Sequence, residues 1–214
     1  MRPRMVVIAG PPGSGKSAAF PVSSFGIDSF NADDRAAQIN SGSYQGISLE
    51  IRAAVNKEFE GFVEDHIRRH RSFVIETTLR SDITFRQVHQ ARAEGFEIHM
   101  RYIALSDFSQ NLNRVTARAR AGGHSAPADQ LRRIHDASLA NLLLAIRETD
   151  ELRVYDNSAP GQQPEVVLST QNGSINYLCA QTPQWLEDAL RGTEYEITES
   201  LRAAIDRGGT SFDR

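Results

Sequence analysis

One short stretch near the start of the chain constrains its fold more than any other. Residues 10–17 read GPPGSGKS and follow directly on the apolar run MVVIAG. They match the pattern G-x-x-x-x-G-K-[ST], in which glycines turn backbone N–H groups around phosphate oxygens and a helix begins at the lysine. The stretch therefore predicts a buried strand, a phosphate-binding loop and a helix, in that order. The alternative is an ordinary glycine-rich turn between a strand and a helix.

Each part of this loop has a chemical role. Lys16 places a mobile positive charge at the β- and γ-phosphates, so we expect its side chain to face solvent. Ser17 offers a hydroxyl ligand to Mg²⁺. The predicted cofactors are therefore ATP or GTP with Mg²⁺, bound by the loop residues Gly10, Pro11, Pro12, Gly13, Ser14, Gly15, Lys16, Ser17 and Ala18.

Buried strands alternate with helices along the first three quarters of the chain. Short apolar runs predict strands at 5–9, 25–31, 72–76, 96–105 and 153–157. Helices are expected from Lys16 to Pro21, from Ser48 to 67, at 82–94, at 107–121 and from Pro127 to about 149. In the helix that begins at Ser48 the apolar positions step by three and four, which gives it one buried face. The fold class is therefore α/β, a P-loop NTPase-type, mostly parallel sheet with helices on both faces.

The character of the chain changes after residue 157. EVVLSTQNGSINYL predicts a hairpin around Asn172 and Gly173, followed by a short helix containing Trp185 and a polar tail that frays after about 207. We expect residues 1–157 to form the core, with an arginine-bearing helical lid at about 107–149, and residues 158–214 to form a C-terminal extension packed on it.

Composition narrows the choice of partners and compartment. The formal net charge is −3, which does not indicate bulk attraction to nucleic acid or to an anionic membrane. Cys179 is the single cysteine, which excludes an intrachain disulfide and a cysteine metal site. The apolar run behind the loop is too short for a signal peptide or a membrane span. We expect a cytoplasmic protein that binds neither nucleic acid nor membrane.

Acidic residues follow the second predicted strand. FNADDR at 30–35 places Asp33 where ligands of α/β proteins bind, at the carboxyl end of a strand. A kinase that phosphorylates a hydroxyl needs one carboxylate to orient it and accept its proton, and Asp33 is the candidate. Asp34 is the expected helix cap beside it. The alternative is that both acids only cap a helix.

VIETTLRS at 74–81 leaves the next strand. Glu76 is placed to orient the Mg²⁺ shell, directly or through water. Thr78 and Arg80 are placed to bind an anionic co-substrate. The alternative is local, with the hydroxyls capping the following helix and the arginine exposed.

NRVTARARAGGHSAP at 113–127 carries Arg114, Arg118 and Arg120 just before a glycine break. Arg114 and Arg118 are four residues apart, so they share one face of a helix. Guanidinium groups there neutralise the charge that spreads during phosphoryl transfer. The alternative is a solvated basic face, and His124 is expected to pack or cap rather than to bind metal.

Many protein classes use this kind of loop, and two of them are disfavoured here. A GTPase carries a guanine-reading N-K-x-D, and NKEF at 56–59 lacks the aspartate. A motor or helicase is usually longer than 214 residues. A compact small-molecule kinase is the favoured class. The alternatives are a polynucleotide 5′-kinase and a P-loop nucleotide-binding module that is not a kinase.

The assembled pattern resembles the zeta toxins of bacterial toxin–antitoxin modules and their stand-alone relatives. The resemblance covers roughly 5–157, and ETTL with GGH-x-x-P is similar to the branch common in Gram-negative bacteria. It rests on ordered motifs: GPPGSGKS, NAD, FVIETTLRS, GGHSAP, LRRIHDASLANL and VYDNS. It implies an ATP-dependent kinase whose acceptor is the 3′-hydroxyl of the amino sugar of UDP-N-acetylglucosamine, and an inhibiting antitoxin, if one exists, on a separate chain.

The resemblance also assigns roles to residues. It places the general base at Asp33 and acceptor contacts at Thr78 and Arg80, with a sugar-binding glutamate at Glu60 and Glu58 close by. A second lid arginine of the toxins falls near His124, where Arg132 or Arg133 is the substitute. Taken together, the expected catalytic residues are Asp33, Lys16, Arg118 and Arg120, and the expected acceptor-binding residues are Glu60, Glu76, Thr78, Arg80 and Arg114.

Overall fold

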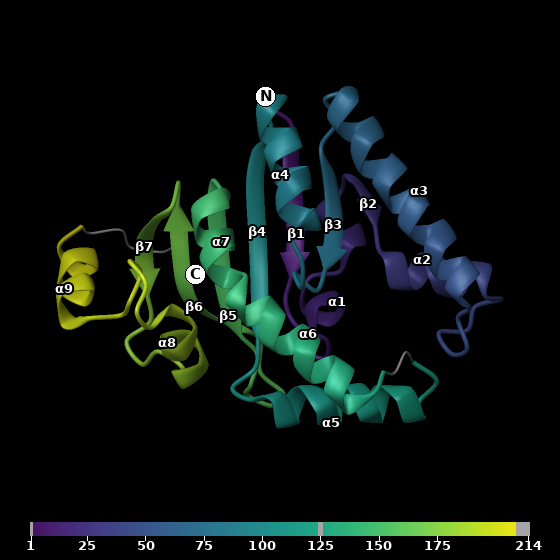
Figure 1. Ribbon diagram of the computed structural model, residues 1–214. Coiled ribbons are helices and arrows are strands. Elements are labelled where there is room, and N and C mark those ends of the chain that lie inside the picture. The colour runs from purple at the N-terminus through teal and green to yellow at the C-terminus, as the bar shows by residue number, and fades with distance from the viewer. Residues whose placement is uncertain (1, 124–125, 209–214) are drawn as a thin grey trace.

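A computed structural model describes residues 2–123 and 126–208 of the chain, so His124 and Ser125 lie outside the described residues. The described part contains a seven-stranded sheet in the order β2-β3-β1-β4-β5-β6-β7 (Figure 1). Strands β1 to β5 pair in parallel, and β6 and β7 are antiparallel. The strands are β1 Arg4–Ala9, β2 Asp28–Phe30, β3 Phe73–Thr77, β4 Glu97–Ala104, β5 Glu151–Asp156, β6 Glu165–Gln171 and β7 Ser174–Leu178.

Helices connect the parallel strands, as the alternating pattern predicted. They are α1 Lys16–Ala19, the 3₁₀ helix η1 Val22–Phe25, α2 Ala32–Ile39, α3 Leu49–Arg68, α4 Ile83–Ala93, α5 Phe108–Arg120, α6 Ala128–Ala140, α7 Leu142–Glu148, α8 Gln184–Leu190 and α9 Glu199–Gly208. The α/β class with a mostly parallel sheet is confirmed. No described helix is long and apolar enough to cross a membrane.

The strand order gathers the candidate residues at one edge of the sheet. β1 lies between β3 and β4 and is parallel to both, so the carboxyl ends of these strands lie side by side. The loop after β1, the segment after β3 and the start of α5 all leave from this edge. Ligands of open α/β sheets bind at this edge because the connections diverge there.

The main core lies on one face of the sheet. Apolar side chains of β1, β3, β4 and β5 pack there against α3, α4, α7 and α8. The opposite face has a smaller cluster, in which Val6, Ile8 and Val74 are covered by side chains from η1 and the loops on either side of it. Burial on both faces explains why the strands read as continuous apolar runs.

Local signals fixed several boundaries. Pro21 follows α1, which ends at Ala19 after one turn, as predicted. Ser48 accepts a hydrogen bond from the Ile51 N–H and starts α3. Gly95 follows α4 with a φ of 80°. At these places the sequence contains the side chain or the backbone freedom that the boundary needs.

Three expectations about helices need correction. The single helix expected from Pro127 to about 149 is divided at Asn141 into α6 and α7. The cap of α2 is Asn31, which accepts from the N–H groups of Asp33 and Asp34, so neither acid caps the helix. The polar tail contains a helix, α9, and residues 209–214 lie outside the described residues.

The C-terminal segment continues the sheet. β6 pairs with β5, and β7 pairs with β6, through the predicted turn at Asn172 and Gly173. Both turn residues have positive φ, 48° and 75°, as a two-residue hairpin turn requires. Trp185 lies in α8 and packs into the main core. Residues 158–208 thus share the sheet and core of the preceding residues.

Candidate active site

The loop of residues 10–17, called the cradle below, has a backbone that only glycine tolerates at several positions. Gly13 and Gly15 have φ of 79° and 94°. A Cβ on Gly10 would lie 2.1 Å from the carbonyl oxygen of Ile103 on β4. The loop is therefore held against β4, and its conformation matches the turn that directs N–H groups toward a phosphate.

Lys16 is buried at the start of α1, with 7% of its surface exposed. Its ammonium donates to the carbonyls of Gly10 at 2.8 Å and Pro11 at 3.1 Å. The expectation that the side chain faces solvent was therefore wrong, because the loop carbonyls bind the ammonium. Burial lowers the pKa of Lys16, the charges of Glu76 and Asp33 raise it, and the charge of Arg118 lowers it. Charged groups on β3, α2 and α5 therefore all influence the Lys16 ammonium.

Ser17 and Glu76 form a polar pair next to the cradle. The Ser17 hydroxyl donates to the two oxygens of the Glu76 carboxylate at 2.9 and 3.1 Å. The side-chain amide of Asn31 donates to the same carboxylate at 3.3 Å. Burial raises the pKa of Glu76, and the Lys16 charge and the Ser17 hydrogen bond oppose that rise. A hydroxyl and a carboxylate are oxygen donors of the kind that Mg²⁺ prefers, so these residues fit Mg²⁺.

Asp33 and Asp34 occupy the first turn of α2 and are both exposed. The Asp34 carboxylate accepts a hydrogen bond from the Tyr44 hydroxyl at 2.8 Å. The charge of Asp33 raises the pKa of Lys16, of Glu76 and of Tyr44, so its carboxylate lies within electrostatic reach of all three. The two neighbouring acids therefore have different surroundings.

Thr78 and Arg80 follow β3 and flank Leu79. Thr78 is half-buried and Arg80 is exposed, whereas Leu79 is completely buried. Within the described residues, no ion pair engages the Arg80 guanidinium. The position of Arg80, four residues after Glu76, places its charge at the same edge of the sheet as the cradle.

Arg114 and Arg118 extend from α5 beside the cradle. The Arg114 guanidinium donates to the carbonyl of Asn157 at 2.8 Å, and the Asn157 amide donates to the Ser14 carbonyl at 2.8 Å. Arg118 is exposed, and its charge lowers the pKa of both Lys16 and Tyr44. Arg120 is the last residue of α5 and is exposed, and its charge has no comparable effect on the pKa of Lys16 or Tyr44.

Arg132 and Arg133, the substitutes expected for a second lid arginine, make contacts within α5 and α6. The Arg132 guanidinium lies 4.0 Å from the centre of the Phe108 ring. Arg133 pairs with Asp129 one turn earlier in α6, at 2.8 Å. The first contact joins α6 to α5, the second lies within α6, and neither involves the cradle.

The two candidate glutamates of α3, Glu58 and Glu60, also differ. Glu58 pairs with Arg35 of α2 through two hydrogen bonds of 2.6 and 3.2 Å. Glu60 is exposed. The structure thus joins Glu58, the alternative to Glu60, to the helix that carries Asp33 and Asp34.

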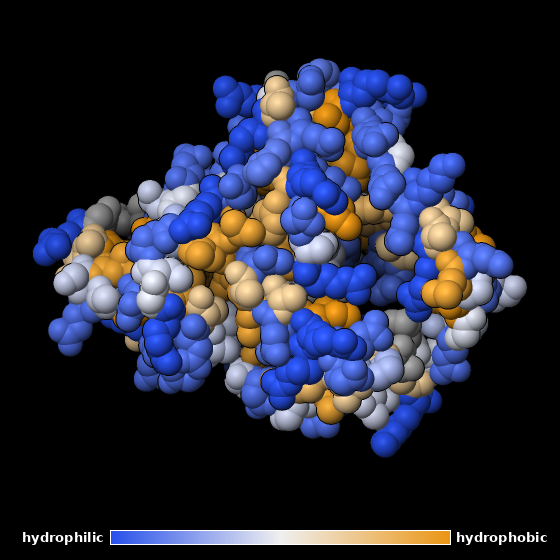
Figure 2. Space-filling view, in the orientation of Figure 1, coloured by the Kyte–Doolittle hydropathy of each residue, from blue (hydrophilic) through white to orange (hydrophobic). Residues whose placement is uncertain are grey.

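This edge of the sheet is hollowed. Figure 2 shows a recess with largely hydrophilic walls between the α2–α3 side and the α5 side of the molecule. A cavity of about 330 Å³ adjoins the cradle, lined by Ser17, Pro21, Val22, Ser23, Ser29, Phe30, Asn31, Asp34, Arg35 and Gln38. It has room for a small polar molecule next to the Ser17–Glu76 pair.

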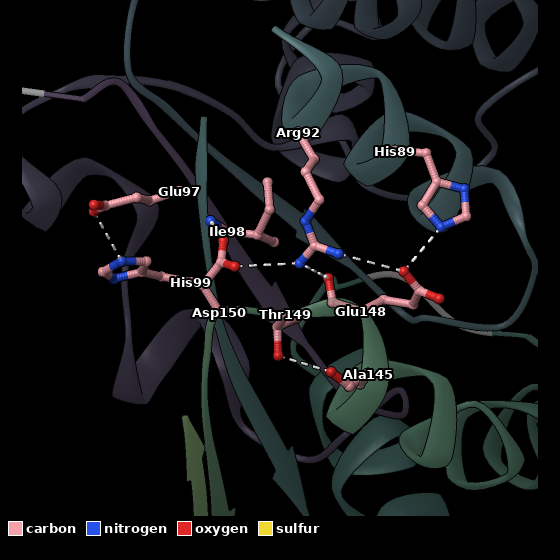
Figure 3. Close-up of polar contacts among 9 residues, drawn as sticks. All are labelled: His89, Arg92, Glu97, Ile98, His99, Ala145, Glu148, Thr149 and Asp150. Atoms are coloured by element: carbon pink, nitrogen blue, oxygen red, sulfur yellow. Dashed lines mark hydrogen bonds and ion pairs between the residues drawn. The ribbon is translucent and has the colours of Figure 1, made fainter. Parts of the chain in front are cut away.

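A larger cavity of about 600 Å³ lies at the opposite edge, where β4 and β5 begin. Several charged groups in and around its walls are engaged with one another (Figure 3). Arg92 binds Asp150 and the end of α7, and Glu148 lies 2.9 Å from His89. His99 lies between Glu97 and Glu151 at 3.7 and 3.8 Å. We place the candidate site at the smaller cavity because Ser17 of the cradle and Asn31 line it, and both bind the Glu76 carboxylate.

Three asparagines at the site were missed by sequence reasoning. Asn31 binds the Glu76 carboxylate and caps α2, Asn111 donates to the Pro12 carbonyl at 2.8 Å, and Asn157 donates to Ser14. Asn31 and Asn157 directly follow strands that point to the cradle, and that position was the signal available. No such signal exists in the sequence for Asn111, because it is one polar residue among many in α5.

Comparisons with known proteins agree with this architecture. No family model matches the chain. An uncharacterised protein of Haemophilus influenzae is 29% identical over 134 residues, covering 60% of this chain and 90% of that protein.

Two solved structures cover 97% of this chain, each at 16% identity. The AvrRxo1-ORF1:-ORF2 complex with ATP has a TM-score of 0.65 and is matched over 75% of its chain. The PezAT chromosomal toxin–antitoxin system of Streptococcus pneumoniae has a TM-score of 0.57 and is matched over 84%. At such identities the similarity shows a shared fold.

Proposed function

We propose that this protein is an ATP-dependent, Mg²⁺-requiring kinase that transfers the γ-phosphoryl group to a hydroxyl of a small anionic acceptor. The observation that supports this proposal most directly is that a hydroxyl and two carboxylates lie near the cradle lysine. Ser17 and Glu76 are hydrogen-bonded there, and the Asp33 charge acts on both Lys16 and Glu76 from α2. A carboxylate in that position serves a hydroxyl acceptor, whereas a nucleotide-binding switch has no use for it.

In this proposal each part of the reaction is carried out by particular residues of this chain. The cradle N–H groups and Lys16 bind the β- and γ-phosphates, and Ser17 and Glu76 would hold Mg²⁺. When bound, Mg²⁺ neutralises charge on those phosphates. Asp33 accepts the proton of the acceptor hydroxyl while the hydroxyl oxygen forms a bond to the γ-phosphorus. The bond between the γ-phosphorus and the β,γ-bridging oxygen breaks, and ADP leaves with that oxygen. Arg118 stabilises the charge that spreads in the transition state.

The acceptor we propose is a UDP-N-acetyl amino sugar. Its support is the resemblance to the zeta toxins, in the Gram-negative-type branch, together with the exposed Arg80 guanidinium beside the site. We also propose that α5 and α6 act as a lid over the phosphates. A separate antitoxin chain as partner and a cytoplasmic location belong to the same proposal, supported by the shared fold with toxin–antitoxin structures.

The test is mass spectrometry of a bacterial metabolite extract incubated with the protein and ATP-Mg. We expect a new species heavier by one phosphoryl group, at the mass of a phosphorylated UDP-N-acetyl amino sugar. Lys16→Met, which keeps the length of the side chain and removes its charge, is the matched inactive control. An RNA oligonucleotide with a free 5′-hydroxyl is assayed in parallel. Phosphorylation of the oligonucleotide alone would replace the small-molecule assignment by a polynucleotide kinase.

A further inference from the structure

Leu79 has a backbone conformation that leucine rarely adopts. Its φ is 54°, in the left-handed region where Cβ crowds the following carbonyl. Three other described non-glycine residues have positive φ, and all three are polar and exposed: Ser41, His70 and Asn172. Leu79 is apolar and completely buried. Strained backbone that is held in place by its surroundings often marks a functional segment.

Side chains fix both peptide groups of Leu79. Its N–H donates to the Thr77 hydroxyl at 3.1 Å, and that hydroxyl lies 3.4 Å from the hydroxyl of Thr84 on α4. Its carbonyl accepts from the side-chain amide of Asn141 at 2.8 Å. The segment from Thr77 to Arg80 therefore has little freedom to relax out of the strained turn.

The backbone position of Asn141 is fixed by hydrogen bonds to both neighbouring helices. It lies between α6 and α7, and its backbone bonds to Ala137 on one side and Ala145 on the other. One turn earlier the hydroxyl of Ser138 lies 3.1 Å from that of Tyr102 on β4. The amide of Asn141 is thus presented to Leu79 from a helix anchored on the sheet.

We propose that Asn141 is a positioning residue for the acceptor: by holding the Leu79 carbonyl, it fixes the turn that presents Thr78 and Arg80. This inference rests on the proposed function, because it uses Thr78 and Arg80 as the acceptor-binding residues. It adds that the α6–α7 junction determines their position. Because α6 follows α5 in the chain, the same amide also links the proposed lid to the acceptor side of the site.

Two measurements test this on the full-length protein carrying Asn141→Asp. The substitution keeps the size of the side chain and replaces the donating amide by an acceptor. We expect faster hydrogen–deuterium exchange in peptides covering residues 77–82. With UDP-N-acetylglucosamine as probe, we expect the acceptor KM to rise about five- to tenfold, the worth of one such hydrogen bond, while the KM for ATP stays unchanged.

Thr149→Val is the matched control. It removes another side-chain hydrogen bond of α7, from the Thr149 hydroxyl to the Ala145 carbonyl at 2.7 Å, which does not involve the turn. We expect it to lower thermal stability without changing the exchange at 77–82 or the acceptor KM. Should Asn141→Asp fail to fold, Asn141→Ala replaces it, because alanine removes the amide without placing a carboxylate against the carbonyl.

The outcomes separate this inference from the proposed function. Unchanged exchange at residues 77–82 in a folded variant overturns the positioning role, whatever the acceptor is. Faster exchange with an unchanged acceptor KM overturns the link between the turn and the acceptor. If neither UDP-N-acetylglucosamine nor any extract component is phosphorylated by the unmodified protein, the proposed function fails, and the exchange measurement still decides whether Asn141 holds the turn.

Discussion

The side-chain amide of Asn157 donates a hydrogen bond to the backbone carbonyl of Ser14 at 2.8 Å. The same amide nitrogen occupies the space beside Gly15, where an added Cβ would lie 2.4 Å from it. Arg114 in turn binds the Asn157 carbonyl. The end of β5 and one arginine of α5 therefore clamp the cradle from the side opposite Glu76.

Gly15→Ala should weaken ATP binding by about tenfold or more. A φ of 94° is strained for alanine, and the methyl group displaces the Asn157 amide that holds the loop. Isothermal titration with ATP-Mg measures the effect. The control is Gly61→Ala in the middle of α3, where an added Cβ meets open space, so the variant should gain about 0.5–1 kcal/mol of stability with ATP affinity unchanged. Equal ATP affinity in both variants would show that the clamp is dispensable.

Glu76 should titrate above its ordinary value in the metal-free protein. Burial is the largest influence on its pKa and raises it, because a buried carboxylate loses hydration. The Ser17 hydrogen bond favours the charged form, so Ser17→Ala should raise the pKa of Glu76 further. Carbon-13 NMR of the labelled carboxyl group during a pH titration measures both values. A midpoint at or below 4.5, or no shift in the Ser17 variant, contradicts the geometry of this pair.

The sequence predicted those parts of the fold that depend on local signals. The cradle motif, the apolar runs and the cap at Ser48 each contain the residues that form the element. Pro21 predicted the early end of α1 for the same reason. The mostly parallel direction of the strands also followed, because strands that are connected through helices usually run parallel.

The remaining features depend on contacts between residues far apart in the chain. Asn157 and Ser14 are 143 residues apart, and Asn141 and Leu79 are 62 apart. An asparagine in a sequence does not reveal which distant carbonyl it will bind, so the clamp and the division of α6 from α7 were missed. The burial of Lys16 was missed for a related reason, because its partners are carbonyls that the folded loop turns inward.

Arg118 should contribute more to phosphoryl transfer than Arg120. The charge of Arg118 acts on Lys16 and on Tyr44, and the loop carrying Tyr44 reaches α5 through a hydrogen bond from Gln45 to the Ala119 carbonyl. Arg118→Ala should lower kcat by about 10²-fold with little change in the KM for ATP, because it meets charge that develops in the transition state. Arg120→Ala, two residues away, should weaken turnover less. An equal or larger loss of kcat in the Arg120 variant would contradict the larger role of Arg118. If neither variant lost activity, both arginines would belong to a solvated helix face with no part in the transfer.

The two acids at the start of α2 offer a matched pair for the last test. Asp34 is engaged by the Tyr44 hydroxyl, which also holds the loop between α2 and α3. Asp33 has no such partner among the described residues, and its charge acts across the site on Lys16 and Glu76. An engaged carboxylate is a structural group, whereas an unengaged one beside the cradle is available to a hydroxyl.

Asp33→Asn should lower acceptor phosphorylation by about 10²- to 10⁴-fold, the usual worth of a positioned general base. ATP should bind about as well as before, because Asp33 does not hold the phosphates. Asp34→Asn keeps an oxygen that accepts from Tyr44, so it should retain most of the activity, and Tyr44→Phe tests that hydrogen bond separately. Steady-state kinetics with the acceptor, together with ATP titrations, compare the three variants. Normal turnover in Asp33→Asn with a large loss in Asp34→Asn would transfer the role of base to Asp34. Normal turnover in both would leave Glu76 as the remaining carboxylate at the cradle to be tested.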